Sequence, residues 1–395
     1  CLVGSEMCIR DRFYTAQSGI WQTVWIEKVP ECYIGHLKIT PLYDQSSIMI
    51  QMEEEHGIKD IDYEVTITAR KMWPVKASGK TGKPCVIMIP HMRSWSPEDP
   101  FLYDLHVRMG EDSVESYFAM RKVEVKNDKE GIPRIFLNNE PYFEKGVLDQ
   151  GYWPDGLYTP PCDEAMIYDI QKMKDLGFNM IRKHIKIEPQ RWYYHCDRIG
   201  MLVWQDMPSG GGQYNLLTIS APLITGVHLK DSHYRLFART DAEGRDSYTR
   251  ELEELVAQLQ NCPCIVLWVP FNEGWGQFDA LKAVQAIRRR DATRTIDHAS
   301  GWYDQGGGDI KSIHWYFRPY RHRQPPGEQR PVCLTEYGGY NCAVPGHCRG
   351  EKHEFGYKKT ADPAAFNRAF RRLMEEQIIP AKAGGLAAAV YTQLS

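Results

Sequence analysis

The sequence predicts an immunoglobulin-like β-sandwich followed by a (β/α)8 barrel, and a change of pattern along the chain leads to this fold class. Up to about residue 127, apolar and polar side chains alternate with a period of two, which is typical of half-buried strands. Beyond that point, short apolar strands alternate with helical stretches, which is typical of a parallel sheet. The chain of 395 residues is long enough for two or three domains.

Two segments carry the period-two pattern of the predicted sandwich most clearly. Apolar side chains occupy every second position of Ile61–Thr68, with polar or charged residues between them, and Phe101, Tyr103, Leu105 and Val107 alternate in the same way with Asp104, His106 and Arg108. Glycine and proline clusters at Ser78–Pro84 and Ser96–Pro100 supply turns between strands. Several short strands in succession favour a sandwich of the immunoglobulin type.

The second part of the chain predicts the strands and helices of the barrel in order. The expected strands are Pro141–Leu148, Asn179–Lys183, Met201–Trp204, a strand ending at Glu273, Thr295–His298, Ser312–Trp315, a strand ending at Glu336, and Leu386–Tyr391. The expected helices are Asp163–Leu176, Pro189–Arg198, Ser247–Leu259, Asp279–Arg290 and Pro363–Gln377. The long segment Pro208–Ala238 contains a glycine run without Walker spacing, so we expect a mobile loop on the active face rather than a phosphate site.

Two glutamates at the ends of predicted strands are the strongest functional signal. Glu273 follows the apolar run Ile265–Val269, and Glu336 follows Pro331–Cys333; glycines come after both. A parallel barrel places its catalytic groups at the carboxyl ends of its strands. One such glutamate could simply cap a helix, but two on the fourth and seventh strands indicate the pair of carboxylates that hydrolysis of a glycosidic bond requires.

The neighbours of the two glutamates suggest different roles for them. Trp268, Phe271 and Trp275 flank Glu273, and apolar walls raise the pKa of a carboxyl group, so Glu273 is the predicted general acid/base. A nucleophile needs partners that keep it ionised. For Glu336 the candidates are Arg182, at the end of the second strand, and Tyr316, at the end of the sixth.

At these motifs the chain resembles glycoside hydrolase family 2, which contains β-galactosidases, β-glucuronidases and β-mannosidases. The segments that carry the resemblance are Ser18–Trp25 for the end of an N-terminal sugar-binding sandwich, Trp95–Tyr103 and Phe118–Arg121 for an immunoglobulin-like second domain, and Gly177–Arg182, Asn272–Gly274 and Thr335–Gly338 for strands two, four and seven of the catalytic barrel.

The resemblance implies a retaining mechanism with Glu273 as acid/base and Glu336 as nucleophile, their carboxyl groups ~5–5.5 Å apart. It also implies that Asn272 holds the 2-hydroxyl of the sugar, that Arg182 lies beside the nucleophile, and that Tyr316 is the tyrosine of strand six.

Other candidate substrate contacts leave alternative roles open. His184 stands one residue earlier than the histidine of the Arg-x-x-His run of β-galactosidases, which leaves a sugar ligand and a packed core histidine as alternatives. Asp149 and Asp206 end strands one and three, where each could bind sugar hydroxyls or cap a loop. His314 on strand six and Trp302 complete the candidates, Trp302 as a stacking wall or a buried tryptophan.

The composition of the chain argues against several other classes of function. A formal net charge of −3 gives no electrostatic reason to expect nucleic acid or a membrane surface as partner, and no apolar run is long enough for a membrane span. The expected partner is an oligosaccharide or glycoside, a homo-oligomer is left open, and no cofactor is expected. Eleven scattered cysteines are typical of reduced thiols, which favours the cytoplasm without fixing the compartment. A zinc site at Cys342, His347, Cys348 and His353 is a weaker alternative.

The expected organisation of the chain has four parts. Residues 1–12 fit no domain pattern and are expected to be a non-native leader, and 13–30 a remnant of an N-terminal jelly-roll sugar-binding domain. The immunoglobulin-like sandwich is expected over 31–126 and a barrel truncated at its C-terminal end over 127–395.

The expected function is that of a retaining exo-β-glycosidase of the β-galactosidase type. A β-glucuronidase or β-mannosidase is the alternative within the family, and the family's Asn-x-Lys segment for a sugar carboxylate would lie past residue 395. Alternatives from other classes are a non-catalytic carbohydrate-binding protein on the same scaffold and a zinc hydrolase.

Overall fold

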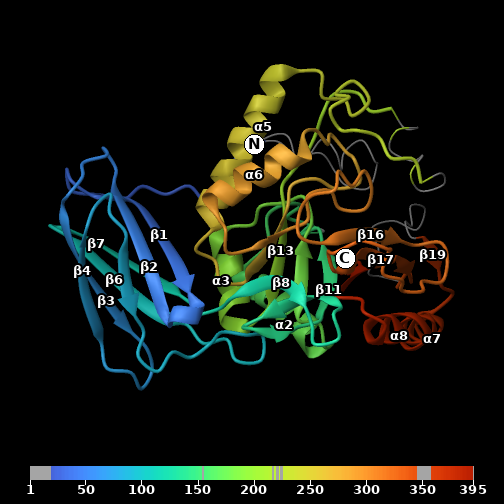
Figure 1. Ribbon diagram of the computed structural model, residues 1–395, viewed down its shortest axis with the longest axis horizontal. Helices are drawn as coiled ribbons and strands as arrows, with labels where there is room; N and C mark the ends of the chain where they lie inside the picture. The colour runs from blue at the N-terminus through green and yellow to red at the C-terminus, as the bar shows by residue number, and fades with distance from the viewer. Residues whose placement is uncertain are drawn as a thin grey trace.

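A β-sandwich and a curled parallel sheet surrounded by helices lie side by side in the computed structural model, the sandwich on the left of Figure 1 and the sheet on the right. The structure describes residues 19–153, 155–215, 218, 222, 226–344 and 357–394. This arrangement confirms the predicted fold class of an immunoglobulin-like sandwich followed by a barrel.

The sandwich consists of a three-stranded sheet of order β1-β2-β5 and a four-stranded sheet of order β4-β3-β6-β7. Its strands are β1 (Ile34–Leu42), β2 (Ser47–Glu54), β3 (Asp62–Thr68), β4 (Val75–Lys80), β5 (Cys85–Met88), β6 (Tyr103–Met109) and β7 (Asp112–Phe118), with the short 3-10 turn η1 (Tyr43–Gln45) after β1. The predicted alternation is confirmed, because Val65 on β3 and Val107 on β6 are buried partners of one antiparallel pair.

A small antiparallel sheet connects the sandwich to the barrel. It has the order β10-β9-β8, from β8 (Val123–Asn127), β9 (Pro133–Leu137) and β10 (Glu140–Pro141). Ile135 of β9 belongs to the same apolar core as the barrel strands, and Val123 and Val125 pack against that core. The predicted first barrel strand, Pro141–Leu148, is therefore divided between β10 and the next strand.

The second half of the fold is an eight-stranded sheet of order β15-β14-β13-β12-β11-β20-β17-β16. Its strands are β11 (Glu144–Asp149), β12 (Met180–Lys183), β13 (Leu202–Asp206), β14 (Ile265–Val269), β15 (Thr295–Ile296), β16 (Lys311–Trp315), β17 (Val332–Gly338) and β20 (Ala388–Thr392), and all neighbours are parallel. The ladder opens between β15 and β16. There the N–H of Asp309 donates to the carbonyl of Ile296 at 2.8 Å and bridges the two edges. A short pair, β18 (Tyr340–Asn341) and β19 (Lys358–Lys359), extends from the end of β17.

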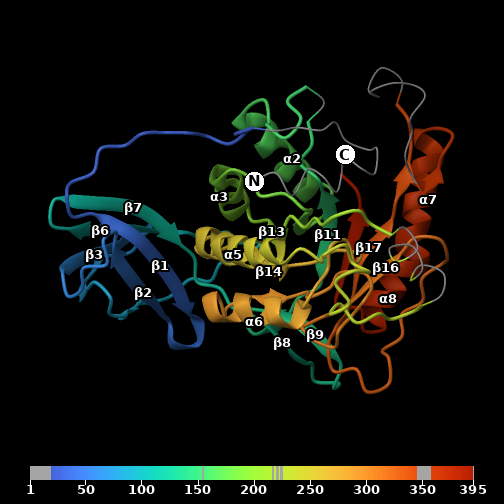
Figure 2. The same cartoon turned by 90° about the horizontal axis from the view of Figure 1, so that it is seen from above.

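Helices cover the outside of the first strands of the sheet, as Figure 2 shows from above. They are α2 (Asp163–Asp175), α3 (Gln190–Ile199), α5 (Ala242–Leu259) and α6 (Ala280–Arg290), followed near the end of the chain by α7 (Pro363–Leu373), the π-turn η2 (Met374–Ile378) and α8 (Ile379–Ala383). Within the described residues, none of these helices has the length and apolar character needed to cross a bilayer. The fully described stretch from 297 to 331 contains β16 but no helix, which agrees with the absence of an expected helix between Thr295 and Glu336.

Two helix boundaries differ from the prediction for local reasons. Helix α5 begins at Ala242 rather than Ser247, because the Asp241 carboxylate accepts from the N–H groups of Glu243 and Gly244 and caps the helix. The predicted helix Pro363–Gln377 ends its regular part at Leu373. The π-turn that follows leads into Pro380, which has no N–H for a regular helical hydrogen bond.

A buried arginine joins the sandwich side of the chain to the start of β14. Arg121 donates to the carbonyl oxygens of Pro263, Ile265 and Thr293 at 2.8, 2.9 and 3.2 Å. The N–H of Cys264 is also bound, by the Asp197 carboxylate at 2.6 Å, and Tyr117 donates to the same carboxylate at 2.7 Å. These contacts fix the strand whose far end leads to Glu273.

We expect the replacement Arg121→Met to lower the free energy of unfolding by about 3 kcal/mol, because buried carbonyl groups would lose their donors. Equilibrium denaturation by urea measures the change. The matched control is Arg108→Met, which removes an exposed ion pair to Glu64 and should cost no more than about 0.5 kcal/mol. Equal losses in both variants would contradict a structural role for Arg121.

Candidate active site

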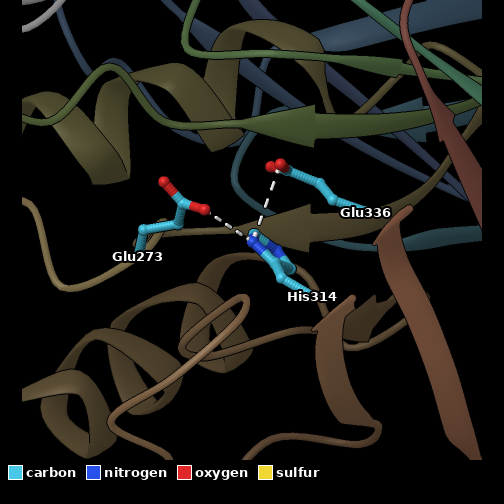
Figure 3. A group of neighbouring side chains, drawn as sticks. All are labelled: Glu273, His314 and Glu336. Atoms are coloured by element: carbon cyan, nitrogen blue, oxygen red, sulfur yellow. Dashed lines mark hydrogen bonds and ion pairs between the residues drawn. The ribbon is translucent and has the colours of Figure 1, made fainter. Parts of the chain in front are cut away.

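Glu273 and Glu336 converge at the carboxyl ends of the barrel strands, where Figure 3 shows their side chains on either side of His314. One carboxylate oxygen from each glutamate and one ring nitrogen of His314 all lie within 4.8 Å of one another. Glu336 is part of β17 and Glu273 follows β14, so groups 63 residues apart in the printed sequence meet at one site.

The backbone of Glu273 is strained. Its φ of +53° lies in the left-handed region, which side chains other than glycine rarely adopt. The N–H of Glu273 donates to the carbonyl of Ser300 at 2.8 Å, and the carbonyl of Glu273 accepts from the indole N–H of Trp302 at 2.8 Å. Strained residues that their surroundings hold in place cluster at functional sites.

The surroundings of Glu273 favour its protonated form. Burial raises the pKa of Glu273, although His184, Arg182 and a hydrogen bond from Trp275 oppose that rise. The Nδ1 atom of His314 lies 2.9 Å from Oε1 of Glu273, whose side chain remains 20% exposed. This carboxyl group is therefore partly open to a ligand and resists ionisation.

Only one of the three aromatic residues expected to flank Glu273 contacts it in the structure. Trp268 donates its indole N–H to Asp291, and Phe271 packs against Tyr248 of α5, so both face the helix layer. Trp268 is on β14 and Phe271 lies after the strand has ended, and neither side chain is directed toward the carboxyl group of Glu273. His314, Trp302 and Trp275 contact Glu273 instead.

Glu336 has hydrogen-bond donors around it. Arg182 Nη1 lies 3.3 Å from Oε1 of Glu336, and the hydroxyl of Tyr316 donates to Oε2. Burial and the charge of Glu336 raise the pKa of Tyr316 well above its usual value, so its hydroxyl keeps the proton that it donates. A carboxylate held by a guanidinium and a hydroxyl is stabilised in its ionised form.

Asp206 holds the groups that surround Glu336 rather than facing an open space. It accepts from Arg182 Nε and Nη2, both at 3.0 Å, and from His184 Nδ1 at 2.7 Å. Its own side chain is 1% exposed. The expectation that Asp206 binds sugar hydroxyls is therefore not supported by this geometry, because both of its oxygens are already bound.

His184 lies on the inner side of the sheet. Arg182 and His184 are two positions apart and share a face, while Lys183 between them points to the helix layer, where its ammonium group lies over Trp192. The His184 side chain is 10% exposed, and its proximity lowers the pKa of Glu273. Of the two alternatives for His184, the structure places it with the candidate site.

Asp149 lies on the opposite side of the sheet from the two glutamates. It is paired in register with Lys183, which binds its carboxylate at 2.6 Å, and the N–H of Gly151 binds the other oxygen at 2.7 Å. Lys183 also donates to Glu188 at 2.9 Å. The register of β11 against β12 therefore makes Asp149 part of a buried ion-pair cluster, which corrects its candidacy as a sugar ligand.

His314 also has a position that the sequence did not reveal. Its side chain has no exposed surface, so it is enclosed between Glu273 and Glu336 and cannot serve as the direct sugar ligand that was expected. Burial lowers the pKa of His314 to about 4. The spacing His314-x-Tyr316 was the available signal, because residues two apart on a strand share a face.

The remaining candidates line the site in different ways. Asn272 accepts from Arg182 Nη2 at 2.9 Å through its side-chain oxygen. Trp302 is partly exposed and packs edge-on against His314, with ring centroids 5.4 Å apart. Tyr357, which sequence reasoning did not single out, stacks on Tyr316 with ring centroids 4.0 Å apart.

The spacing of the Glu273, His314 and Glu336 donor atoms would accommodate a divalent cation, but their chemistry argues against one. Arg182 already neutralises Glu336 at 3.3 Å, and a cation would be placed against that guanidinium charge. We therefore do not assign these residues as metal ligands. Of the other predicted metal group, Cys342 is a free cysteine, and His347, Cys348 and His353 lie outside the described residues.

Comparisons with known protein families match both parts of the chain. The family described as glycosyl hydrolases family 2, TIM barrel domain, matches residues 162–361, and the family described as glycosyl hydrolases family 2 matches residues 32–121. The first match covers half of the 395 residues and includes both glutamates.

Curated relatives are similar over much of this chain. The β-galactosidase of Klebsiella pneumoniae strain 342 is 24% identical over 372 residues, which cover 83% of this chain and 33% of the relative. The β-galactosidase of Pectobacterium atrosepticum is 30% identical over 267 residues, which cover 62% of this chain and 23% of the relative. The chain thus spans about a third or less of the length of these relatives.

Solved structures share the fold at low identity. The β-D-glucuronidase of Dictyoglomus thermophilum has a TM-score of 0.67 and 16% identity, and the match covers 92% of this chain and 62% of that one. A β-galacturonidase of Eisenbergiella tayi, solved with bound galacturonate, has a TM-score of 0.64 and 18% identity, covering 93% of this chain and 65% of the other.

The strained backbone at Glu273 leads to a test of stability. We expect Glu273→Gly to be more stable than Glu273→Ala by about 1 kcal/mol, because glycine adopts a positive φ without the penalty that a Cβ atom brings. Urea denaturation of both variants measures the difference. The same pair of substitutions at Glu243, in the first turn of α5, is the control and should give the opposite order. A less stable glycine variant at position 273 would argue against strain.

Proposed function

The chain belongs to glycoside hydrolase family 2, and from this premise we propose that it is a retaining exo-β-glycosidase of the β-galactosidase type. It hydrolyses terminal β-linked sugars by double displacement. The observation that carries the proposal is the approach of two unlike carboxyl groups, Glu273 and Glu336, to within 4.8 Å at the strand ends. Retaining enzymes keep their carboxyl groups about 5–5.5 Å apart, whereas inverting enzymes leave about 6.5–9.5 Å for a water molecule.

The two glutamates have the electrostatic asymmetry that this mechanism needs. Arg182 and Tyr316 bind Glu336 and orient its carboxylate, which attacks the anomeric carbon of the sugar. Glu273, whose pKa burial raises, gives its proton to the leaving oxygen. In the second half-reaction Glu273 takes a proton from water, and that water releases the sugar from Glu336.

Asn272 is proposed to bind the 2-hydroxyl of the sugar. Arg182 occupies its side-chain oxygen at 2.9 Å, which fixes the orientation of the amide and leaves the NH2 group as the donor to a ligand. His184 is the second proposed sugar contact, because Asp206 binds its Nδ1 atom and its side chain keeps some exposure. Trp302 is proposed to form an aromatic wall beside the acid.

The charges near the site support a neutral sugar over a uronic acid. In the part of the chain that the structure describes, Arg182 beside the glutamates is paired with Asp206 and Glu336, whereas Lys183 is paired with Asp149 and Glu188 on the other side of the sheet. A sugar carboxylate would therefore meet, in Arg182, a cation whose charge is already balanced. Turnover of a panel of nitrophenyl β-glycosides tests this point, with the galactoside expected to exceed the glucuronide.

We expect Glu273→Ala to lower kcat/KM for substrates with poor leaving groups by about a hundredfold or more, because these need a proton on the departing oxygen. Activated aryl glycosides should be affected far less, and azide should restore part of the rate. Steady-state kinetics over a series of leaving groups measures the contrast. Glu164→Ala, at an exposed position of α2, is the control. A uniform loss across all leaving groups would count against Glu273 as the acid.

We expect a 2-fluoro glycoside with a good leaving group to inactivate the protein by attaching to Glu336, because the fluorine slows hydrolysis of the glycosyl-enzyme more than its formation. Peptide mass spectrometry locates the label. The variant Glu336→Gln should remain unlabelled under the same conditions. A label on any other carboxylate would overturn the assignment of the nucleophile.

A further inference from the structure

A run of buried hydroxyl groups extends behind His314, away from the two glutamates. Ser300 Oγ lies 3.1 Å from His314 Nε2 and 3.3 Å from Ser312 Oγ, and Ser312 Oγ lies 2.5 Å from Thr335 Oγ1. The Thr335 hydroxyl then donates to the carbonyl of Ile313 at 3.4 Å. We call Ser300, Ser312 and Thr335 the hydroxyl run.

The last contact sets the direction of all the others. A carbonyl oxygen can only accept, so the single hydroxyl proton of Thr335 goes to Ile313. Ser312 then donates to Thr335, and Ser300 donates to Ser312, because each hydroxyl has one proton to give. The contact between Ser300 and His314 is left without a hydroxyl proton, and the proton in it must come from Nε2 of the histidine.

A buried carboxyl group beside the run offers Ser300 a second acceptor for its proton. Burial raises the pKa of Asp297, while Arg182, His298 and the hydroxyls of Ser312 and Ser300 lower it. Asp297 is 0% exposed, and within the described part of the chain its oxygens have no hydrogen bond of normal geometry. If Ser300 turns to Asp297 instead of Ser312, its proton still points away from His314.

We propose that the hydroxyl run fixes His314 in the neutral form that carries its proton on Nε2. The Nδ1 atom then accepts a hydrogen bond from the protonated carboxyl group of Glu273. The inference deepens the proposed function, because it takes Glu273 as the acid. Ser300, Ser312 and Thr335 are then positioning residues, since they act on Glu273 through His314. The 2.9 Å contact between His314 Nδ1 and Glu273 Oε1 is the hydrogen bond that they orient.

The charges around His314 make the position of its one proton decisive. Burial lowers the pKa of His314 to about 4. The charges of Arg182 and His184 lower this pKa further, and those of Glu336 and Asp206 oppose the shift. The ring is therefore neutral near pH 7. With the proton on Nε2, Nδ1 stabilises the protonated form of Glu273. With the proton on Nδ1, the ring would donate to Glu273 and stabilise its ionised form.

The direct test is nuclear magnetic resonance of the full chain with 15N-labelled histidine at pH 7, where two-bond proton–nitrogen correlations distinguish the two neutral forms. Loss of one signal in His314→Gln assigns that residue. We expect the Nε2–H form in the unaltered protein and a shift toward Nδ1–H in Ser300→Ala. The nearly isosteric Thr335→Val, which removes the anchor of the run, should move in the same direction.

The matched control is Thr295→Val, which removes a buried hydroxyl that donates to Val266 elsewhere in the barrel. It should leave the His314 signal unchanged. An Nδ1–H form in the unaltered protein would overturn the proposal, and so would an unchanged signal in both Ser300→Ala and Thr335→Val.

The pH dependence of kcat/KM tests the effect of the hydroxyl run on the pKa of Glu273. In Ser300→Ala the alkaline limb of the kcat/KM profile should move to lower pH by about one unit, because the protonated form of Glu273 loses a hydrogen bond. An unmoved limb would contradict the link to Glu273. The resonance measurement does not depend on turnover, so the two proposals can fail separately. If the protein shows the expected histidine form but has no glycosidase activity, only the proposed function is refuted. If the protein is active but His314 has the opposite form, only this inference is refuted.

Discussion

The buried guanidinium of Arg182 is the interaction on which the rest of the site depends. It contacts both oxygens of Asp206, one oxygen of Glu336 and the side chain of Asn272, and its side chain has no exposed surface. An enclosed charge is stable only when carboxylates compensate it, and loss of one partner from such a set typically costs about 3–5 kcal/mol. Because the partners come from β13, β17 and the segment after β14, one positive charge holds three strand ends in register. The nucleophile proposed here is thus a structural partner of Arg182 as well as a chemical group.

The second glutamate is held in a different way, and the difference gives the pair its chemistry. Glu336 is surrounded by donors that stabilise a negative charge, whereas Glu273 stands on a left-handed backbone and has only part of its surface open. His314 lies between them with no exposure and has contacts to both. His314 therefore links a carboxyl group that resists ionisation to a carboxyl group that is surrounded by hydrogen-bond donors. Such unlike surroundings suit the separate roles proposed for the two glutamates.

Residues outside the site hold the segment that carries Glu273 at both of its ends. Arg121, which follows the sandwich, and Asp197 of α3 fix the start of β14, and Ser300 and Trp302 bind the backbone of Glu273 after its end. Ser300 and Trp302 belong to the connection from β15 to β16, which is a long loop and contains no helix. A loop at that position brings backbone and hydroxyl groups to the base of the site, which a helix on the outside of the sheet would not do. The contacts that hold the backbone of Glu273 thus come from a loop that interrupts the regular alternation of strands and helices.

Local patterns in the sequence were sufficient to predict the fold class and to place the two glutamates at the ends of strands. Period-two alternation marks the sandwich strands because one face of each is buried, and strands followed by glycines mark the ends where a barrel collects its polar groups. Only the tertiary structure decided which polar residues share a space. Asp149 faces Lys183 on the helix side because of the register of β11 against β12, and Asp206 is occupied because Arg182 and His184 reach it from the neighbouring strand. His314 is enclosed because Glu273 and Glu336 arrive from separate strands. Sequence patterns report the side of a strand on which a residue lies, but its partners depend on register and on the curl of the sheet, which distant segments determine together.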